Sequence, residues 1–341
     1  MKHLKYFPNA AAIGSGIEVD LPNVSYLEGK NVLYVPGEND TAIVKVNSDT
    51  GEIERELPPD YSTMYLTFEV IQGGTFTFTG AESSGYNLKY SLDDGAKWST
   101  LSSYSTTKNF SSGTKIIWKA TGLTPKTNRG IGTISSTAKF NVYGNVMSLL
   151  YGDEFVGKTD LTNKSYAFCK LFNNCSSLID ASNLVLPATI LASSCYESMF
   201  DGCTSLTTAP AILPATTLAS NCYSAMFNRC TSLTTAPTLP ATTLASGCYG
   251  YMFTDCTSLT AAPALPATTL LSYCYSNMFK NCANLNYIKA MFTTTPSTTY
   301  TEDWVSGVSS TGTFVKNSAA TWNVTDINGI PSGWTVETAS S

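Results

Sequence analysis

The 341-residue sequence has little charge. Only 13% of its residues are charged, and the formal net charge is −5. So few Lys and Arg residues do not favour the basic surface that binds nucleic acid or an anionic membrane. The water-facing surface must therefore consist largely of Ser, Thr and Asn. Such a surface offers neutral hydrogen bonds, as sugar-contacting and virion proteins do, but a merely soluble repeat protein would have the same composition.

Histidine is nearly absent. His3 is the single one, so a Ser-His-Asp or Cys-His arrangement would have to use a residue beside the start of the sequence. The acids within the repeats described below do not recur at one repeat position in a way that would pair two carboxylates. They are Asp180, Glu197, Asp201 and Asp255. The sequence predicts no enzyme, no cofactor and no metal site.

Long apolar runs are also missing. No segment reaches the roughly 18 apolar residues of a membrane helix. The first residues carry two Lys but no apolar run of the kind an export signal needs, and Ala10 to Ile13 is too short. If Met1 is the native start, this favours a virion protein, which is assembled inside the cell, over an exported bacterial one. If the sequence was trimmed, it favours neither.

What the sequence does contain is a repeat between about Tyr166 and Met291. The motif Cys-Tyr-x-x-Met-Phe-x-x-Cys begins at Cys195, Cys222, Cys248 and Cys274, at steps of 27, 26 and 26 residues. A weaker copy, with Leu171-Phe172 and Cys175, precedes them. A period of this size predicts a solenoid of stacked units.

Comparison of the copies predicts which residues are buried. The near-constant positions have the spacing i, i+3, i+4, i+7, i+8, i+11, which matches one stripe of a helix. In the first strong copy they are Ala192, Cys195, Tyr196, Met199, Phe200 and Cys203. A Thr-rich segment closed by proline follows each helix and predicts one strand, as in 204–210, 231–237 and 257–263. Each strand-plus-helix unit would need its neighbours to bury its apolar face.

The positions that vary between copies form the opposite stripe, which we expect to face water. They are Ser194, Glu197, Ser198 and Asp201; Asn221, Ser224, Ala225 and Asn228; Gly247, Gly250, Tyr251 and Thr254; Tyr273, Ser276, Asn277 and Lys280. Drift on an unconstrained face would explain this variation as well as adaptation to a ligand would. Exposed tyrosines serve both sugar stacking and protein contacts. The predicted candidate binding surface comprises Glu197, Ser198, Ser224, Asn228, Tyr251, Thr254, Tyr273 and Asn277.

The ten cysteines lie between positions 169 and 282 and suggest zinc or disulfides. The two cysteines of one unit are eight residues apart on the predicted helix, or roughly 12 Å, which is too far for a disulfide. Zinc ligands usually come as closely spaced cysteine pairs, and the repeats contain no histidine. We therefore expect ladders of thiols packed as small apolar side chains. Cys169 lies off these ladders and is expected to be exposed or free.

The repeats resemble the 26-residue leucine-rich repeats of BspA-like bacterial surface proteins. The flanking pieces 144–152, 312–315 and 330–334 are similar to segments around such repeats in gut Bacteroidales and their phages. Lys2 to Phe7 and Leu21 to Tyr26 are similar to the starts of Bacteroidales phage structural proteins. The resemblance implies a non-enzymatic, surface-exposed role and names no ligand.

Two β-rich regions precede the repeats. Residues 1–57 contain three short strand candidates, 32–35, 42–46 and 53–57, and are predicted to dock the protein onto a larger assembly. Residues 58–145 alternate strictly enough to predict an antiparallel β-sandwich. Within them, Ser91 to Trp98 is similar to an Asp-box, which is a structural hairpin turn and implies no catalysis.

Four regions follow from these patterns: 1–57, 58–145, the repeats with their lead-in at 146–291, and a linker with a C-terminal cap at 292–341. The expected cap residues are Trp304, Trp322 and Trp334, because a solenoid needs a cover on its last unit. The predicted fold class is multidomain α+β, with an N-terminal β-rich segment, a β-sandwich and a leucine-rich-repeat solenoid.

The predicted function is that of a fibre-like structural protein on the virion surface of a Bacteroidales-type phage. Its expected partners are other virion proteins or copies of itself, and a glycan or protein of the host cell surface. Nucleic acid and membrane insertion are not expected. The alternative is a bacterial cell-surface adhesin of the BspA-like kind.

Overall fold

The computed structural model describes residues 59–81, 87–101 and 105–339, together with the backbone of six short strands before residue 58. The chain divides into two compact units, Met1–Asp60 and Tyr61–Ser341. In the first unit, β1 (Leu4–Tyr6) pairs with β2 (Ile17–Val19). A four-stranded antiparallel sheet comprises β3 (Ser25–Tyr26), β4 (Val32–Tyr34), β5 (Ile43–Val46) and β6 (Ile53–Glu56).

The three strands expected in this region are therefore confirmed as β4, β5 and β6. Its expected docking role concerns side chains that lie outside the described residues, so that role stays a prediction.

The second unit begins with the 3-10 helix η1 (Tyr61–Thr63) and two sheets. The larger sheet has the order β10-β9-β12-β7-β14-β15, and β16 pairs with β14. These strands are β7 (Leu66–Gln72), β9 (Leu88–Ser91), β10 (Ser99–Leu101), β12 (Lys115–Ala120), β14 (Lys139–Asn145), β15 (Leu178–Asp180) and β16 (Leu184–Val185). The smaller sheet, β11-β8-β13, contains β8 (Gly74–Gly80), β11 (Ser105–Phe110) and β13 (Gly132–Ser136).

Aromatic side chains join these two sheets. The Phe68 ring on β7 lies 5.5 Å from that of Phe76 on β8, and Phe76 lies 4.8 Å from Phe140 on β14. Phe68 also contacts Phe172 of the first repeat, so the sheets and the repeats share one core. The parallel pairing of β14 with β15 and β16 continues this connection in the backbone.

The hairpin between β9 and β10 has the expected Asp-box geometry. The Asp93 carboxylate accepts hydrogen bonds from the Ser91 hydroxyl and the Lys97 amide, both at 2.8 Å. The Lys97 amide bond is the main reason that the pKa of Asp93 lies below its usual value. Trp98 packs against the Tyr65 ring at 5.4 Å. The turn is structural, as the sequence predicts.

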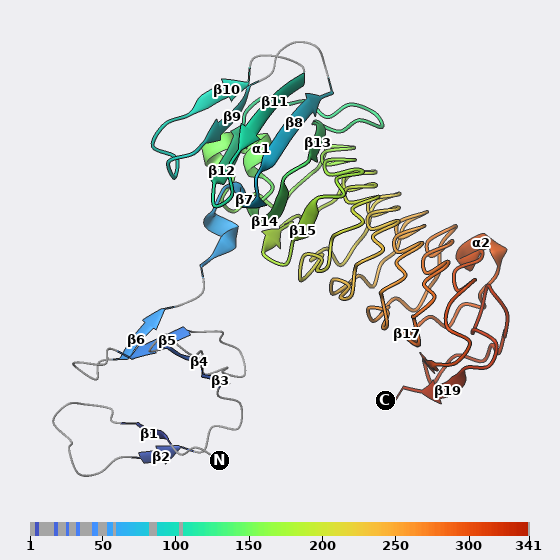
Figure 1. The fold of residues 1–341 in the computed structure, drawn as a ribbon. Coiled ribbons are helices and arrows are strands. Elements are labelled where there is room, and N and C mark those ends of the chain that lie inside the picture. The colour runs from blue at the N-terminus through green and yellow to red at the C-terminus, as the bar shows by residue number, and fades with distance from the viewer. Residues whose placement is uncertain are drawn as a thin grey trace. The chain divides into compact units, whose positions relative to one another are not determined.

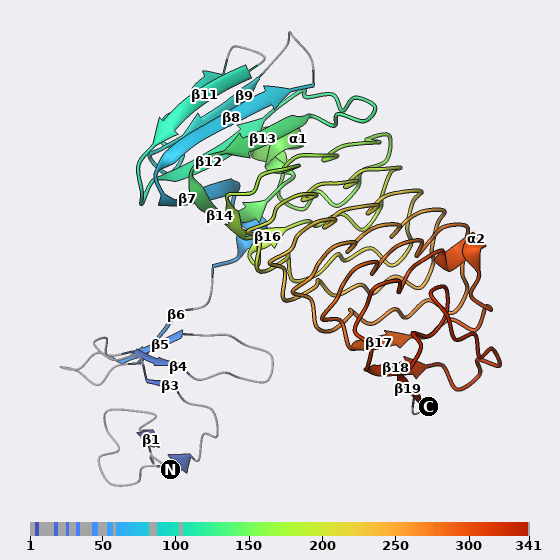
Figure 2. The ribbon, with the colours of Figure 1, turned by 45° about the vertical axis from the view of Figure 1, so that its right-hand side comes forward.

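Between the sheets and the C-terminus the chain winds into stacked coils, one per repeat (Figures 1 and 2). The expected α+β class with a strand-plus-helix leucine-rich-repeat solenoid is wrong. The described residues 155–297 contain no helix, and the two α-helices of the described part, α1 (Ser148–Tyr151) and α2 (Thr298–Thr301), have four residues each. A second 3-10 helix, η2 (Gly152–Glu154), follows α1.

The segments expected to be helical are successions of hydrogen-bonded turns. Amides at alternate positions bond within the coil, as Met199 does to the Tyr196 carbonyl at 3.2 Å. The amides between them bond to the next coil, as Tyr196 does to Cys222 at 2.9 Å and Phe200 to Met226 at 2.9 Å. In an α-helix every interior amide would bond four residues back. Half of the backbone bonding of these segments therefore depends on the neighbouring repeat.

A left-handed residue at every fourth position produces this path. In the second strong copy these are Asn221, Ala225 and Arg229, with φ of 52°, 52° and 59°. The other copies repeat the pattern at Ser194, Ser198 and Gly202; Gly247, Tyr251 and Asp255; Tyr273, Asn277 and Asn281. Gly, Asn and Asp tolerate this conformation best, and they occupy six of these twelve positions.

The prediction of one regular strand after each run of turns is also wrong. These segments contain only isolated bridges, such as Thr208 to Thr235 and Ala261 to Tyr287. The prolines that close them, Pro210 and Pro237, lack the N–H group that would continue a ladder.

The expected interior is confirmed. Tyr, Met, Phe and both Cys of each strong copy are at most 1% exposed. Their rings form two columns: Phe200, Phe227 and Phe253 stack at 5.3 and 5.6 Å with interplanar angles of 4°. The tyrosines stack likewise, at 5.7 to 6.0 Å. Burial of each such side chain stabilises the fold by roughly 1.5–3 kcal/mol.

The same coil path continues past residue 291. Tyr273 and Phe279 donate their amides to Thr299 at 2.7 Å and Trp304 at 2.9 Å. Strands β17 (Tyr287–Ala290), β18 (Thr313–Lys316) and β19 (Thr335–Thr338) form a parallel sheet at this end. The three expected cap residues are buried: Trp304, Trp322 and Trp334 are at most 7% exposed.

Candidate functional site

The structure separates the eight predicted surface residues into three groups. Tyr251 and Tyr273 are exposed, at 47% and 53%. Glu197, Ser224 and Asn228 are half-buried, and Ser198, Thr254 and Asn277 are buried. The expectation that the whole variable stripe faces water is therefore wrong. A turn succession directs some of these side chains between neighbouring coils, where Thr254 donates its hydroxyl hydrogen to the Asn277 carbonyl.

The two exposed tyrosines border a surface hollow of about 320 Å³. Its lining comes from four successive coils and comprises Asn221, Ser224, Gly247, Gly250, Tyr251, Tyr273, Ser276 and Glu302. Of the eight predicted residues, Ser224, Tyr251 and Tyr273 are brought together here. The other five do not line it.

Two glycines of one repeat line the hollow; the Asn221 side chain covers Gly247, and Gly250 is the one that leaves space. Gly250 occupies the position held by Ser224 and Ser276 in the adjacent copies, and Gly247 the position held by Asn221 and Tyr273. The third strong copy therefore lacks two side chains that its neighbours carry. A Cβ at Gly250 would lie 3.4 Å from the Tyr273 carbonyl and 3.8 Å from the Ser276 carbonyl, which are ordinary contacts. The space above Gly250 is open because this residue has no side chain.

Backbone bonds fix the rim of the hollow. Tyr251 donates its amide to the Ser276 carbonyl at 2.8 Å, and Tyr273 donates its amide to Thr299 at 2.7 Å. The Ser224 hydroxyl donates to the Gly250 carbonyl at 3.2 Å. The two aromatic rings therefore project from an ordered backbone.

The acidic end of the hollow is Glu302. The Ser276 hydroxyl lies 3.5 Å from a carboxylate oxygen of Glu302, and the Asn277 side-chain amide donates to that hydroxyl at 2.9 Å. The neighbouring acid, Asp303, is paired with Lys280 at 2.9 Å. This ion pair raises the pKa of Lys280. The chief cause of the raised pKa is the hydrogen bond from the Lys280 ammonium to Asp303, which favours the charged form of the lysine.

No protein-family model, curated protein or solved structure matches this chain.

Sequence reasoning placed seven of the eight lining residues among the variable positions but missed Glu302. Glu302 belongs to the coil after the last recognisable motif, where Trp304 and Val305 replace Met and Phe. A signal was present, because apolar residues recur at 304, 305 and 308, one period after Met278, Phe279 and Cys282.

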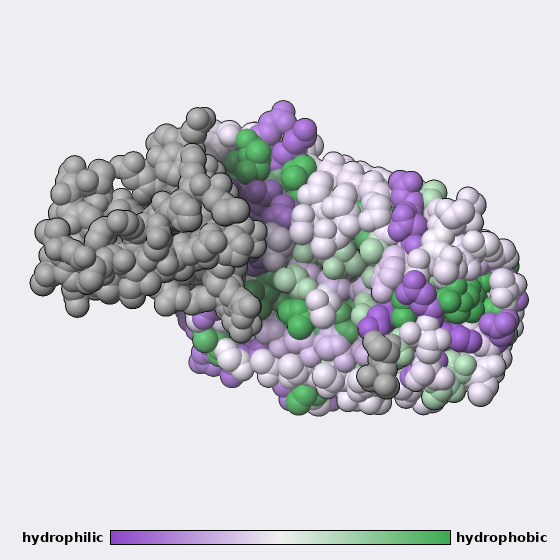
Figure 3. Space-filling view, turned by 90° about the horizontal axis from the view of Figure 1, so that it is seen from below, coloured by the Kyte–Doolittle hydropathy of each residue, from purple (hydrophilic) through white to green (hydrophobic). Residues whose placement is uncertain are grey.

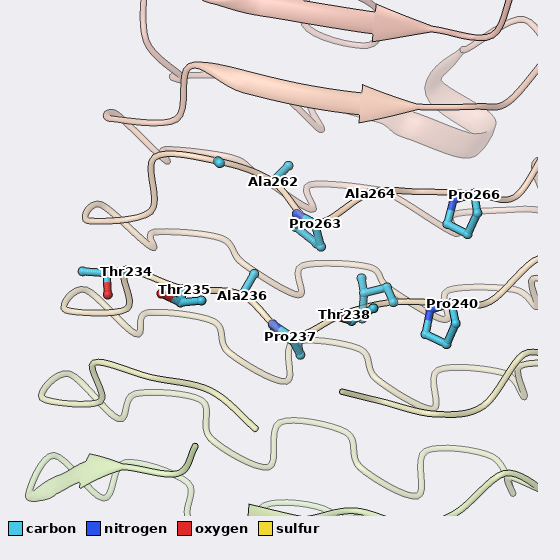
Figure 4. Close-up of a pocket in the computed structure, with 12 residues that line it drawn as sticks. Thr234, Thr235, Ala236, Pro237, Thr238, Pro240, Ala262, Pro263, Ala264 and Pro266 are labelled. Carbon is cyan, nitrogen blue, oxygen red and sulfur yellow. The ribbon is translucent and has the colours of Figure 1, made fainter. Parts of the chain in front are cut away.

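A second hollow, of about 630 Å³, lies between two adjacent extended segments (Figure 4). Matching prolines of neighbouring coils line it, Pro237 beside Pro263 and Pro240 beside Pro266. The rest of its lining is Thr, Ala and Leu, with no titratable group. Its lining offers methyl groups and threonine hydroxyls but no acid or base.

The visible surface of the repeats agrees with the neutral composition. In Figure 3 it is mostly pale, with scattered hydrophilic and hydrophobic groups. In the described part of the chain, none of the helices could span a membrane.

All ten cysteines are free and buried. Cys169, which the sequence left as exposed or free, is free but fully buried. In four copies the second thiol donates to a carbonyl of the preceding coil, at 3.0 to 3.2 Å. Burial raises the pKa of Cys195 and Cys282 to about 12, so these thiols stay protonated at neutral pH. The described residues hold no group of three or more His, Cys, Asp or Glu arranged to bind a metal ion.

Proposed function

We propose that this protein is a non-enzymatic attachment protein of a Bacteroidales-type phage virion, and that its repeats contact a glycan of the host surface. The observation that carries the proposal is the hollow between Tyr251 and Tyr273. Exposed aromatic rings beside hydroxyl and amide groups are suited to a ligand that is apolar on one face and hydroxylated at its edges. Sugar rings have this character.

The chemistry of the hollow favours binding over catalysis. Its titratable lining residues are two tyrosines and Glu302. A general acid and base pair needs two groups whose pKa values are set apart, and a nucleophile needs a neighbouring base. The lining contains one carboxylate and no histidine, and the hydroxyl beside that carboxylate, the one of Ser276, lies at the long distance of 3.5 Å from it.

A glycan is favoured over a protein partner because the surface is neutral and hydroxyl-rich. Protein interfaces are enriched in aromatic residues, Met and Arg, with a more apolar centre. Here the methionines of the motif are buried, and Tyr251 and Tyr273 border a polar hollow. In this proposal the N-terminal unit, Met1–Asp60, docks onto the virion.

The second candidate is a bacterial cell-surface adhesin, which the similarity of the repeat motif to BspA-like proteins favours. It would use the same hollow. Immunogold electron microscopy with antibody against the repeats distinguishes the two. Label on phage particles supports the first candidate, and label on bacterial cells without label on particles supports the second.

Binding of the full-length chain to Bacteroidales cells tests attachment itself. Periodate, which oxidises glycans, should abolish the binding, and protease treatment of the cells should leave it. Binding that is lost with protease and kept with periodate would replace the glycan by a protein receptor. No binding to any strain would remove the proposal.

A further inference from the structure

We infer that the hollow between Tyr251 and Tyr273 is a subsite for one neutral hexopyranose residue. This inference rests on the proposed function and adds the ligand class and the residues that select it. The hollow, at about 320 Å³, lies at the lower end of the range of about 300–1,000 Å³ for ligand pockets. It fits a single sugar ring better than a longer saccharide.

The apolar contact comes from the tyrosines. Both rings are about half exposed, at 47% and 53%, and both are carried by residues whose amides bond to the next coil. Because the backbone is already ordered, only the side-chain torsions of the tyrosines lose freedom when a ligand packs against the rings. The C–H face of a pyranose supplies the matching apolar surface.

The polar contacts come from Asn221, Ser224, Ser276 and Glu302. The amide of Asn221 offers both donors and an acceptor, and the ionised carboxylate of Glu302 accepts only. The bond from Asn277 to the Ser276 hydroxyl leaves the Ser276 proton directed toward Glu302. The remaining acceptor capacity of the carboxylate suits two neighbouring sugar hydroxyls, each of which donates a hydrogen.

The charge excludes acidic sugars. Glu302 faces the hollow, and Lys280, which lies near it, is already paired with Asp303. A sialic or uronic acid would bring a second carboxylate beside Glu302 without a cation to offset it. Hexoses without a charge meet no such repulsion.

Gly250→Gln is the sharpest test. Glutamine is the neutral counterpart of the glutamate found at the equivalent positions 197 and 302, so the coil accepts a side chain of this size. Gly250 does not have a positive φ, and a Cβ there meets only ordinary contacts. The substitution fills the hollow without altering Tyr251, Tyr273 or Glu302.

The experiment uses the full chain and saturation-transfer NMR with methyl glycosides of glucose, galactose and mannose, and with the methyl glycosides of N-acetylneuraminic and glucuronic acid. At least one neutral hexoside should bind, and the acids should not. Gly250→Gln and Tyr273→Ala should each weaken that binding at least tenfold. Glu302→Gln should weaken it less and admit the acids. Tyr287→Ala, at an exposed tyrosine outside the hollow, is the control and should change nothing.

Circular dichroism and the thermal midpoint of each variant show whether it is folded. If Gly250→Gln is folded and binds the hexoside as the natural chain does, the inference is wrong. Equal binding of the acidic sugars would also overturn it. Cell binding separates this failure from a failure of the proposed function. If the natural chain and Gly250→Gln bind periodate-sensitive receptors on cells equally well, the protein attaches to a glycan through another part of its surface.

Discussion

The Cys256 thiol donates to the carbonyl oxygen of Phe227, 3.1 Å away in the preceding coil. Cys248, at the start of the same motif, lies 4.0 Å from the carbonyl of Cys274. Both side chains are fully buried. One repeat thus contains two thiols of equal burial and unequal hydrogen bonding.

We expect Cys256→Ala to lower the free energy of unfolding more than Cys248→Ala does. Each loses a buried sulfur, but only the first also loses a thiol hydrogen bond of 3.1 Å. The Phe227 carbonyl keeps the Cys230 amide as a donor, so the extra cost is that of one hydrogen bond, about 0.5–1.5 kcal/mol. Denaturant titration of both variants measures the difference. Equal losses would mean that the thiols act by volume alone.

Alkaline pH should destabilise the fold. Burial raises the pKa of Cys175 and Cys274 to about 11, from an ordinary thiol value of 9.0. In that interval the unfolded chain has released thiol protons that the folded chain retains, so stability falls as pH rises. The stability that the buried thiols contribute is fully present below pH 9.0 and decreases as the pH rises toward 11 and beyond. Urea midpoints across this range check it, and a midpoint unchanged up to pH 11 would contradict it.

Ala225→Gly should stabilise the protein. Ala225 has a φ of 52°, where an L-residue costs roughly 1–2 kcal/mol and glycine is unstrained. In a helix the same change would cost about 1 kcal/mol, so the sign of the effect distinguishes turns from helix. Ala219→Gly, at a position without positive φ, is the matched control and should destabilise.

Trp304→Ala should lower stability by roughly 3–5 kcal/mol, because the indole is fully buried and contacts Phe279 and Phe292. Its ring nitrogen donates to Gly329 at 2.8 Å. Trp304→Phe keeps a ring but removes this donor, and should cost about 1–3 kcal/mol. Thermal melts rank the two variants. If both behave like the natural chain, Trp304 does not hold the end of the stack.

The sequence predicts the interior of the repeats well and their backbone badly. Cys195, Tyr196, Met199 and Phe200 are buried as expected. Yet turns with a left-handed residue every four positions and a helix of 3.6 residues per turn differ by only about one residue over three turns. The spacing of the apolar residues therefore fits both an α-helix and the succession of turns. The recurrence of Gly, Asn and Asp at the left-handed positions was the signal that separates them.

The hollow was predictable only in part. Internal comparison marks Tyr251 and Tyr273 as variable and aromatic, and it marks Gly250 as variable. It could not show that the absence of a side chain at Gly250 opens a space, because that depends on how closely the coils stack. Glu302 lies in a coil whose motif has diverged, where the match to the repeat fails although the hydrogen bonds continue.

The alternate amides of every coil, such as Tyr196 and Tyr223, are completed by the coil that follows. The amides of an inserted coil would donate to the carbonyls of the coil that follows it. Its own carbonyls would accept from the amides of the coil that precedes it. The length of this protein is therefore adjustable in steps of one repeat, and lineages that gain or lose a copy would shift the distance between the sheet that contains β14 and the tyrosine-lined hollow without redesigning either.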